Sequence, residues 1–113
     1  MNLMDLKYIQ KIAASLNLGS KQISSVYDLN EQGATIPFMA RYRKEATGNL
    51  DEVVIGKIVE EIKYFTELDK RKETVLKTIT GLGKLTPELT LRVENCFDAT
   101  LLEDIYLPFK PKR

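Results

Sequence analysis

The sequence predicts an all-α fold: a helical bundle with short helical hairpins, one long central helix and a helix-turn-helix-like element. Two observations favour it. Apolar residues recur at three- and four-residue spacing along most of the 113 residues, with glycine or proline between the stripes. No stretch shows the period-two alternation of a half-buried strand over more than a few residues. The length has room for one compact domain.

A hairpin of two helices is expected first. An amphipathic stripe covers residues 3–16 and ends before Gly19. Ser20 is the expected N-cap of the second helix, which should end near Gly33.

A short third helix should follow. Pro37 suits its first turn, because the N–H group that proline lacks would be unpaired there. Phe38, Met39 and Tyr42 would form its apolar side, and Gly48 with the residue after it would close it.

The long central helix is expected to open at Asp51, whose side chain can cap its first turn. An apolar stripe runs from residue 54 to residue 68, and six polar residues follow at 69–74. Either one helix of roughly 28 residues crosses solvent there, or it breaks in two. Pairs of opposite charge at helical spacing, such as Glu67 and Arg71, favour the continuous helix.

Two further helices are expected near the C-terminus. Thr86 and Pro87 supply an N-cap and a first-turn proline for a helix reaching Phe97. Thr100 and Glu103 match the capping-box pattern of a last helical segment.

The segment from residue 74 to residue 97 has the general form of a helix-turn-helix element. Its second helix carries Glu88, Glu94 and a single arginine, Arg92, and this net negative face opposes contact with phosphates. A packing hairpin is therefore favoured over base reading.

The composition argues against an enzyme. The chain has no histidine, which excludes Ser-His-Asp triads, Cys-His nucleophile pairs and histidine-ligated zinc or haem. The carboxylates at Glu60–Glu61 and Glu103–Asp104 lack a third convergent ligand, so solvated helix faces explain them best. We expect no catalytic residues, no metal and no cofactor.

The expected location is the cytoplasm, without membrane contact. No apolar run approaches the roughly 18–20 residues of a membrane span, and residues 1–5 lack the start of a signal peptide. A single cysteine, Cys96, fits a reducing compartment. Nothing in the sequence defines an oligomeric state.

Two basic clusters are the candidate nucleic-acid contacts within a chain of net charge +1. The cations of both clusters could bind phosphate. Tyr42, which lies within the first cluster, could stack on a base. Anchoring of neighbouring helices by the arginine stems is the favoured alternative for the first cluster. The candidate residues are Arg41, Tyr42, Arg43 and Lys44, and Lys110, Lys112 and Arg113.

Three segments are distinctive: TIPFMARYRKEATGNLDE at residues 35–52, LTPEL at residues 85–89 and LEDIYLPFKPKR at residues 102–113. Together they resemble the Tex family of bacterial transcription accessory proteins. Asn49 departs from the family pattern, in which a second glycine is common, but asparagine also adopts positive φ.

The resemblance implies that residues 1–113 form an N-terminal helical module of a larger multidomain protein. Ribonuclease-H-like, helix-hairpin-helix and OB-fold domains would follow it. The expected function is a scaffold with an auxiliary nucleic-acid contact, with RNA favoured over DNA and bound mainly through those other domains. The alternative is a protein-interaction module that docks other domains or the transcription machinery.

Overall fold

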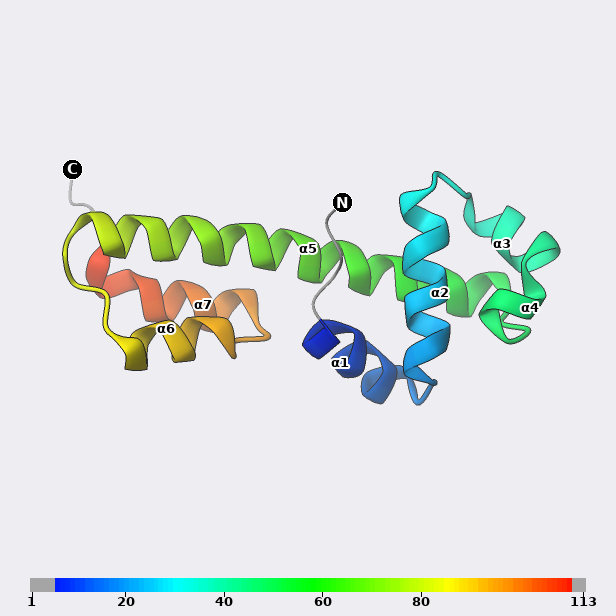
Figure 1. The fold of residues 1–113 in the computed structure, drawn as a ribbon, viewed down its shortest axis with the longest axis horizontal. Coiled ribbons are helices and arrows are strands. Elements are labelled where there is room, and N and C mark those ends of the chain that lie inside the picture. Colours follow the sequence, from blue (N-terminus) through cyan, green and yellow to red (C-terminus); the bar gives the residue numbers. More distant parts are fainter. Residues whose placement is uncertain (1–5, 111–113) are drawn as a thin grey trace. The chain divides into compact units, whose positions relative to one another are not determined.

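The computed structural model describes residues 6–110, and in this range it contains seven α-helices, one short 3-10 helix and no strand. The all-α prediction is confirmed. The chain divides between Tyr64 and Phe65 into two compact units. Figure 1 shows the order of the helices along the chain.

The first unit opens with a hairpin of α1 (Leu6–Leu16) and α2 (Ser20–Glu31), which pack against each other. Asn17 ends α1 in the left-handed conformation, with φ of 57°. The hairpin buries an apolar face made of Tyr8, Ile9, Ile12, Ala13, Ile23, Val26 and Tyr27.

The expected cap of α2 was one residue off. Gly19, and not Ser20, is the N-cap, and Ser20 is the first residue of the helix. The Gln22 side chain makes this start favourable, because its Oε1 accepts a hydrogen bond of 3.0 Å from the Gly19 N–H.

The expected third helix is two helices, α3 (Ile36–Tyr42) and α4 (Lys44–Thr47). Thr35 Oγ1 caps α3 by accepting from the Phe38 N–H, and Pro37 lies in its first turn as expected. Between the helices, Arg43 adopts φ −129° and ψ 38°, outside the helical region.

The Gln22 side chain also links α2 to the end of α4. Its Nε2 donates a hydrogen bond of 2.9 Å to the Thr47 carbonyl oxygen. Thr47 is fully buried, and the next two residues, Gly48 and Asn49, both adopt positive φ, 72° and 64°. The tolerance of Asn49 for this conformation is confirmed.

The long helix α5 (Glu52–Gly81) has 30 residues and no break at residues 69–74. The prediction of a continuous helix is confirmed. Asp51 Oδ1 accepts a hydrogen bond of 2.9 Å from the Val54 N–H and so caps the first turn, as expected. The first part of α5 buries Ile55, Ile58 and Ile62 within the first unit.

The second unit consists of the remainder of α5 together with α6 (Pro87–Glu94), α7 (Ala99–Tyr106) and the 3-10 helix η1 (Leu107–Phe109). In Figure 1, α6 and α7 lie alongside this part of α5. Phe65 on α5 meets Phe97 edge to face at 6.2 Å. The core of the unit includes Val75, Ile79, Leu89, Val93 and Leu102.

Of the caps predicted for the last two helices, one is confirmed and one is wrong. Thr86 Oγ1 accepts from the Leu89 N–H and caps α6 as expected, although α6 ends at Glu94, before Phe97. The capping box at Thr100 is wrong. Asp98 is the N-cap of α7, because its carboxylate accepts from the N–H groups of Thr100 and Leu101.

The turn after α4 generates a prediction. A Cβ atom at Gly48 would lie 2.6 Å from Gln22 Nε2, and the φ of 72° disfavours any side chain there. We expect Gly48→Ala to lower the free energy of unfolding by about 1–2 kcal/mol, through backbone strain and displacement of the Gln22 amide. Urea denaturation followed by circular dichroism measures the change.

Gly81→Ala is the matched control, because a Cβ at this last residue of α5 would meet nothing within 4 Å. It should raise stability by roughly 0.5–1 kcal/mol. Equal effects of the two substitutions would contradict the proposed role of the turn.

Candidate nucleic-acid interface

The first basic cluster lies at the break between α3 and α4. Arg41 and Tyr42 end α3, Arg43 occupies the break, and Lys44 begins α4. Arg43 serves both helices, since its N–H donates to the Met39 carbonyl and its own carbonyl accepts from the N–H groups of Ala46 and Thr47. All four candidate side chains are exposed, as the prediction of a binding surface requires.

Two aromatic rings accompany these cations. Phe38 and Tyr42 are 39% and 63% exposed, and their ring centroids are 5.3 Å apart at an angle of 47°. The Arg43 guanidinium carbon lies 5.5 Å from the centre of the Phe38 ring. We call Phe38, Arg41, Tyr42, Arg43 and Lys44 the cation–aromatic patch.

The apolar side predicted for this helix is therefore only partly correct. Met39 is fully buried, whereas Phe38 and Tyr42 face solvent. Sequence reasoning missed Phe38 as a surface residue. Its spacing of four residues from Tyr42 places both rings on one face of a helix, but this pattern does not distinguish a buried face from an exposed one.

The cations of the patch have no acidic partner among the described residues. Within residues 6–110, no carboxylate lies at ion-pair distance from Arg41, Arg43 or Lys44. Glu45 is an exposed neighbour on α4. Anchoring of neighbouring helices by the stems of Arg41 and Arg43 stays a prediction, and no ion pair in the described part of the chain adds to it.

A groove of about 350 Å³ adjoins the patch. It is lined by the C-terminal end of α2 at Leu29, by the connecting residues 32–35, and by Phe38 and Arg43. The groove thus has one aromatic wall and one cation, and it lies entirely within the first unit.

The second basic cluster has a different environment. Lys110 Nζ lies 3.4 Å from Glu103 Oε1 and 5.7 Å from the centre of the Tyr106 ring. Much of the charge of Lys110 is therefore balanced within the second unit. Lys112 and Arg113 lie outside the described residues.

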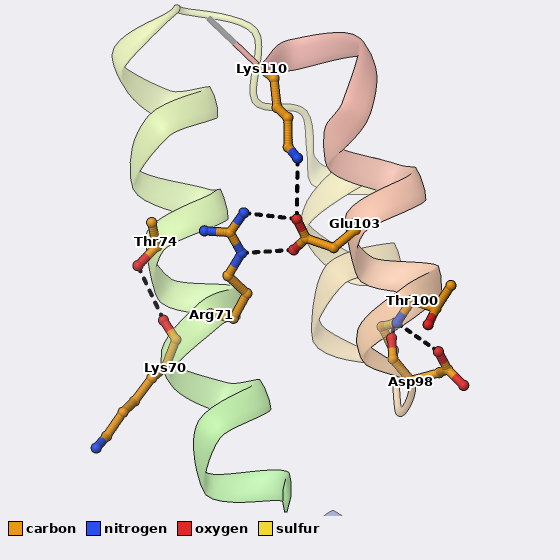
Figure 2. A network of polar contacts seen from close by, with 8 residues as sticks. Lys70, Arg71, Thr74, Asp98, Thr100, Glu103 and Lys110 are labelled. Carbon is orange, nitrogen blue, oxygen red and sulfur yellow. Dashed lines mark hydrogen bonds and ion pairs between the residues drawn. The ribbon is translucent and has the colours of Figure 1, made fainter.

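Glu103 is the centre of this network, which Figure 2 shows. The Arg71 guanidinium on α5 approaches it with two nitrogens, Nε at 2.7 Å from Oε2 and Nη2 at 2.8 Å from Oε1. Such a two-point pair is stronger and more directional than a single contact. The same guanidinium lies 5.2 Å from the Tyr106 ring centre.

The ion pair changes the acidity of both partners. Hydrogen bonds from Arg71 are the main cause that lowers the pKa of Glu103 from its usual 4.5 to about 2. The hydrogen bond to Glu103 likewise raises the pKa of Arg71. Glu103 is thus paired across two helices, while its side chain stays partly solvated, at 38% exposed.

The polar stretch of α5 at residues 69–74 does not simply cross solvent. Lys72 is only 3% exposed, and its Nζ donates a hydrogen bond of 2.9 Å to the Glu94 carbonyl oxygen at the end of α6. It also lies 5.7 Å from the Phe97 ring centre. A lysine at this position neutralises the negative end of the α6 dipole.

The helix-turn-helix-like segment consists of the end of α5, residues 82–86 and α6. Glu88, Arg92 and Glu94 of α6 are all exposed, so its solvent face is net negative as expected from the sequence. A packing hairpin stays the favoured prediction for this segment, because the charge of this face opposes contact with DNA phosphates.

The remaining carboxylates do not gather into a metal site within the described part of the chain. Glu60 and Glu61 line a groove of about 240 Å³ together with Tyr64. Between residues 6 and 110, no helix is long and apolar enough to span a bilayer.

Comparison with known proteins identifies the class. Residues 6–80 match the profile of the Tex-like protein N-terminal domain. The transcriptional accessory protein Tex of Neisseria gonorrhoeae is 45% identical over 102 residues, which cover 90% of this chain and 14% of that protein.

Two further relatives extend the comparison. Protein YhgF of Escherichia coli is 38% identical over 98% of this chain and 14% of its own length, and the human S1 RNA-binding domain-containing protein 1 is 25% identical over 95% and 11%. The chain belongs to the Tex-like family. It spans about one seventh of the length of its bacterial relatives.

The Arg71–Glu103 pair generates a pH prediction. Because the pKa of Glu103 is lowered on folding, the pair stabilises the protein above the unfolded pKa of 4.5, and this contribution is lost as the pH falls from 4.5 towards 2. Both side chains are about 40% exposed, 41% and 38%. Solvent screening therefore limits the contribution to about 1 kcal/mol.

Glu103→Gln should lower the free energy of unfolding by about 0.5–1 kcal/mol at pH 7, and its difference from the unmodified protein should vanish near pH 2. Asp104→Asn removes a charge from an exposed neighbour and should change stability by less than about 0.5 kcal/mol. A difference that stayed constant down to pH 2 would contradict the role of the ion pair.

Proposed function

We propose that this chain is a helical scaffold of a Tex-like transcription accessory protein and that its cation–aromatic patch makes an auxiliary contact with nucleic acid. One observation carries the proposal: three exposed cations without acidic partners within residues 6–110 lie beside two exposed aromatic rings. Cations bind phosphates and aromatic rings stack on bases, so the two together suit a nucleic-acid strand.

The charge of the patch sets the strength of the contact. Three cations neutralise at most about three phosphates, which places the affinity at the weak end of the usual non-specific range of about 10⁻⁴ to 10⁻⁶ M. The net charge of the chain is only +1, so its overall field adds little attraction. The contact is therefore local.

RNA is the favoured ligand. The name of the human relative includes an S1 RNA-binding domain, and the name of the gonococcal relative includes transcription. In this proposal most of the binding energy comes from domains outside the chain. Lys110, Lys112 and Arg113 stay predicted contacts, with Lys110 weakened by its pairing to Glu103.

The proposal assigns no catalytic role to the chain and places it with the transcription machinery in the cytoplasm. The absence of an enzymatic activity stays a prediction.

The patch is tested by removing its three charges together. We expect Arg41→Gln, Arg43→Gln and Lys44→Gln, combined in one variant, to weaken binding to single-stranded RNA and to duplex DNA. The slope of log affinity against log salt should fall by about 2 for single strands, because roughly 0.7 is lost for each phosphate contact. Fluorescence anisotropy at several salt concentrations measures both quantities.

A matched variant controls for net charge. Lys57→Gln, Lys63→Gln and Lys77→Gln remove three exposed lysines from α5 and lower the net charge equally. This variant should retain the affinity and the salt slope. Equal losses in the two variants would show that net charge, and not the patch, attracts nucleic acid.

A docking role is a second candidate, favoured by a separate observation. Four leucines of the second unit are about half or more exposed: Leu82, Leu91, Leu101 and Leu107. In this alternative they contact a protein of the transcription machinery.

We expect a Leu91→Ser, Leu101→Ser variant to weaken binding to purified bacterial RNA polymerase about tenfold, as loss of apolar contacts at an interface does. Biolayer interferometry measures it. The triple glutamine variant of the patch is the control and should bind the polymerase unchanged; equal binding by the leucine variant would contradict docking through these residues.

A further inference from the structure

The groove beside the cation–aromatic patch has a defined chemistry. At about 350 Å³ it lies within the size range of about 300–1,000 Å³ that small-molecule sites occupy. Leu29 and Phe38 supply apolar surface, and Arg43 supplies a cation whose guanidinium lies over the Phe38 ring. Gln32 and Thr35 supply exposed polar side chains on the lining.

Aromatic rings and guanidinium planes both stack on bases that have left a helical stack. A groove lined by both therefore suits a single planar, apolar-faced group. The remaining cations of the patch, Arg41 and Lys44, lie on either side of Arg43 in the chain and are exposed. They can contact phosphates that flank such a group.

We propose that this groove receives one unstacked base of a single-stranded nucleic acid, which stacks on the Phe38–Arg43 pair while the neighbouring phosphates contact Arg41 and Lys44. The inference rests on the proposed function and names its substrate class. Duplex nucleic acid keeps its bases paired and stacked, so it can use the cations but not the groove.

We expect the groove to discriminate little between the different bases. The N–H groups of Gly33 and Ala34 already donate to the carbonyl oxygens of Asn30 and Leu29 at the end of α2, at 3.1 and 3.0 Å. These two backbone donors are therefore engaged and cannot serve a base edge. Stacking tolerates any base, and the few polar side chains on the lining give weak discrimination.

Charge distinguishes this groove from the one at Glu60, Glu61 and Tyr64. That groove also has an exposed aromatic ring, with Tyr64 40% exposed, but two carboxylates border it. Anionic strands are repelled there. The Tyr64 groove is thus a built-in control for an aromatic wall without cations.

The absence of tryptophan from the chain permits a direct test. Phe38→Trp places a single tryptophan in the groove wall, and a stacked base should quench its fluorescence. The probes are a short oligothymidylate strand, an abasic phosphodiester strand of the same length and the corresponding duplex. We expect strong quenching by oligothymidylate and little by the abasic strand or the duplex.

Phe38→Leu, in otherwise unmodified protein, should weaken oligothymidylate binding roughly tenfold, since stacking on one aromatic side chain is worth about that much. Its binding to the abasic strand should be unchanged. Tyr64→Leu, the matched control, should leave both affinities unchanged. Circular dichroism of the variants establishes that each is folded.

The outcomes separate the inference from the proposed function. Equal binding of the abasic and the base-carrying strand, without tryptophan quenching, would overturn base capture and leave the phosphate contact standing. No salt-dependent binding of any probe would overturn both. Loss of oligothymidylate binding in Tyr64→Leu equal to that in Phe38→Leu would also overturn the assignment to this groove.

Discussion

The candidate surface depends on the Gln22 side chain, which bonds in two directions. Its Oε1 accepts from the first N–H before α2, and its Nε2 donates to the carbonyl of Thr47 at the end of α4. The second bond holds α4, which begins with Lys44, near α2. Helix α3, which ends with Arg41 and Tyr42, packs against α4, and the C-terminal end of α2 forms one wall of the groove. A four-residue helix has little stability of its own, so the hydrogen bond from Gln22 and the contacts of α4 with α2 and α3 hold it in place.

In the second unit, the polar residues of α5 take the place of an apolar contact. Arg71 forms an ion pair with Glu103 on α7, and Lys72 donates a hydrogen bond to the Glu94 carbonyl oxygen at the end of α6. Both lysine and arginine have long apolar stems, so they cover core residues while their charged ends meet polar partners. An exposed ion pair contributes little stability, but a two-point pair restricts the angle at which helices meet. The polar stretch therefore orients α6 and α7 on α5 where an apolar stripe would only attract them.

The helices and most of their ends could be predicted from the sequence, because caps and prolines act locally. The predicted N-caps of α5 and α6 are confirmed at Asp51 and Thr86, and the first turn of α3 contains Pro37 as predicted. One error involves a distant partner. Thr100 and Glu103 match a capping box, but Arg71, 32 residues away, takes the glutamate, and Asp98 caps the helix. The patch was predicted as four residues, whereas the exposure of Phe38 and the adjoining groove depend on how α2 ends, which periodicity does not encode.

The two basic clusters differ in whether a carboxylate lies close to their cations. Lys110 and Arg43 are both exposed and both lie over an aromatic ring, yet only Lys110 has a carboxylate within ion-pair distance in the described chain. An unpaired cation gives up only water when it meets phosphate, whereas a paired one must also release its partner. The proposed contact, at about 10⁻⁴ M, would be too weak to hold a strand alone. The bacterial relatives are about seven times longer than this chain. A second binding site, joined to the patch at an effective concentration of about 10⁻³ M, would let the patch add roughly tenfold to the total affinity.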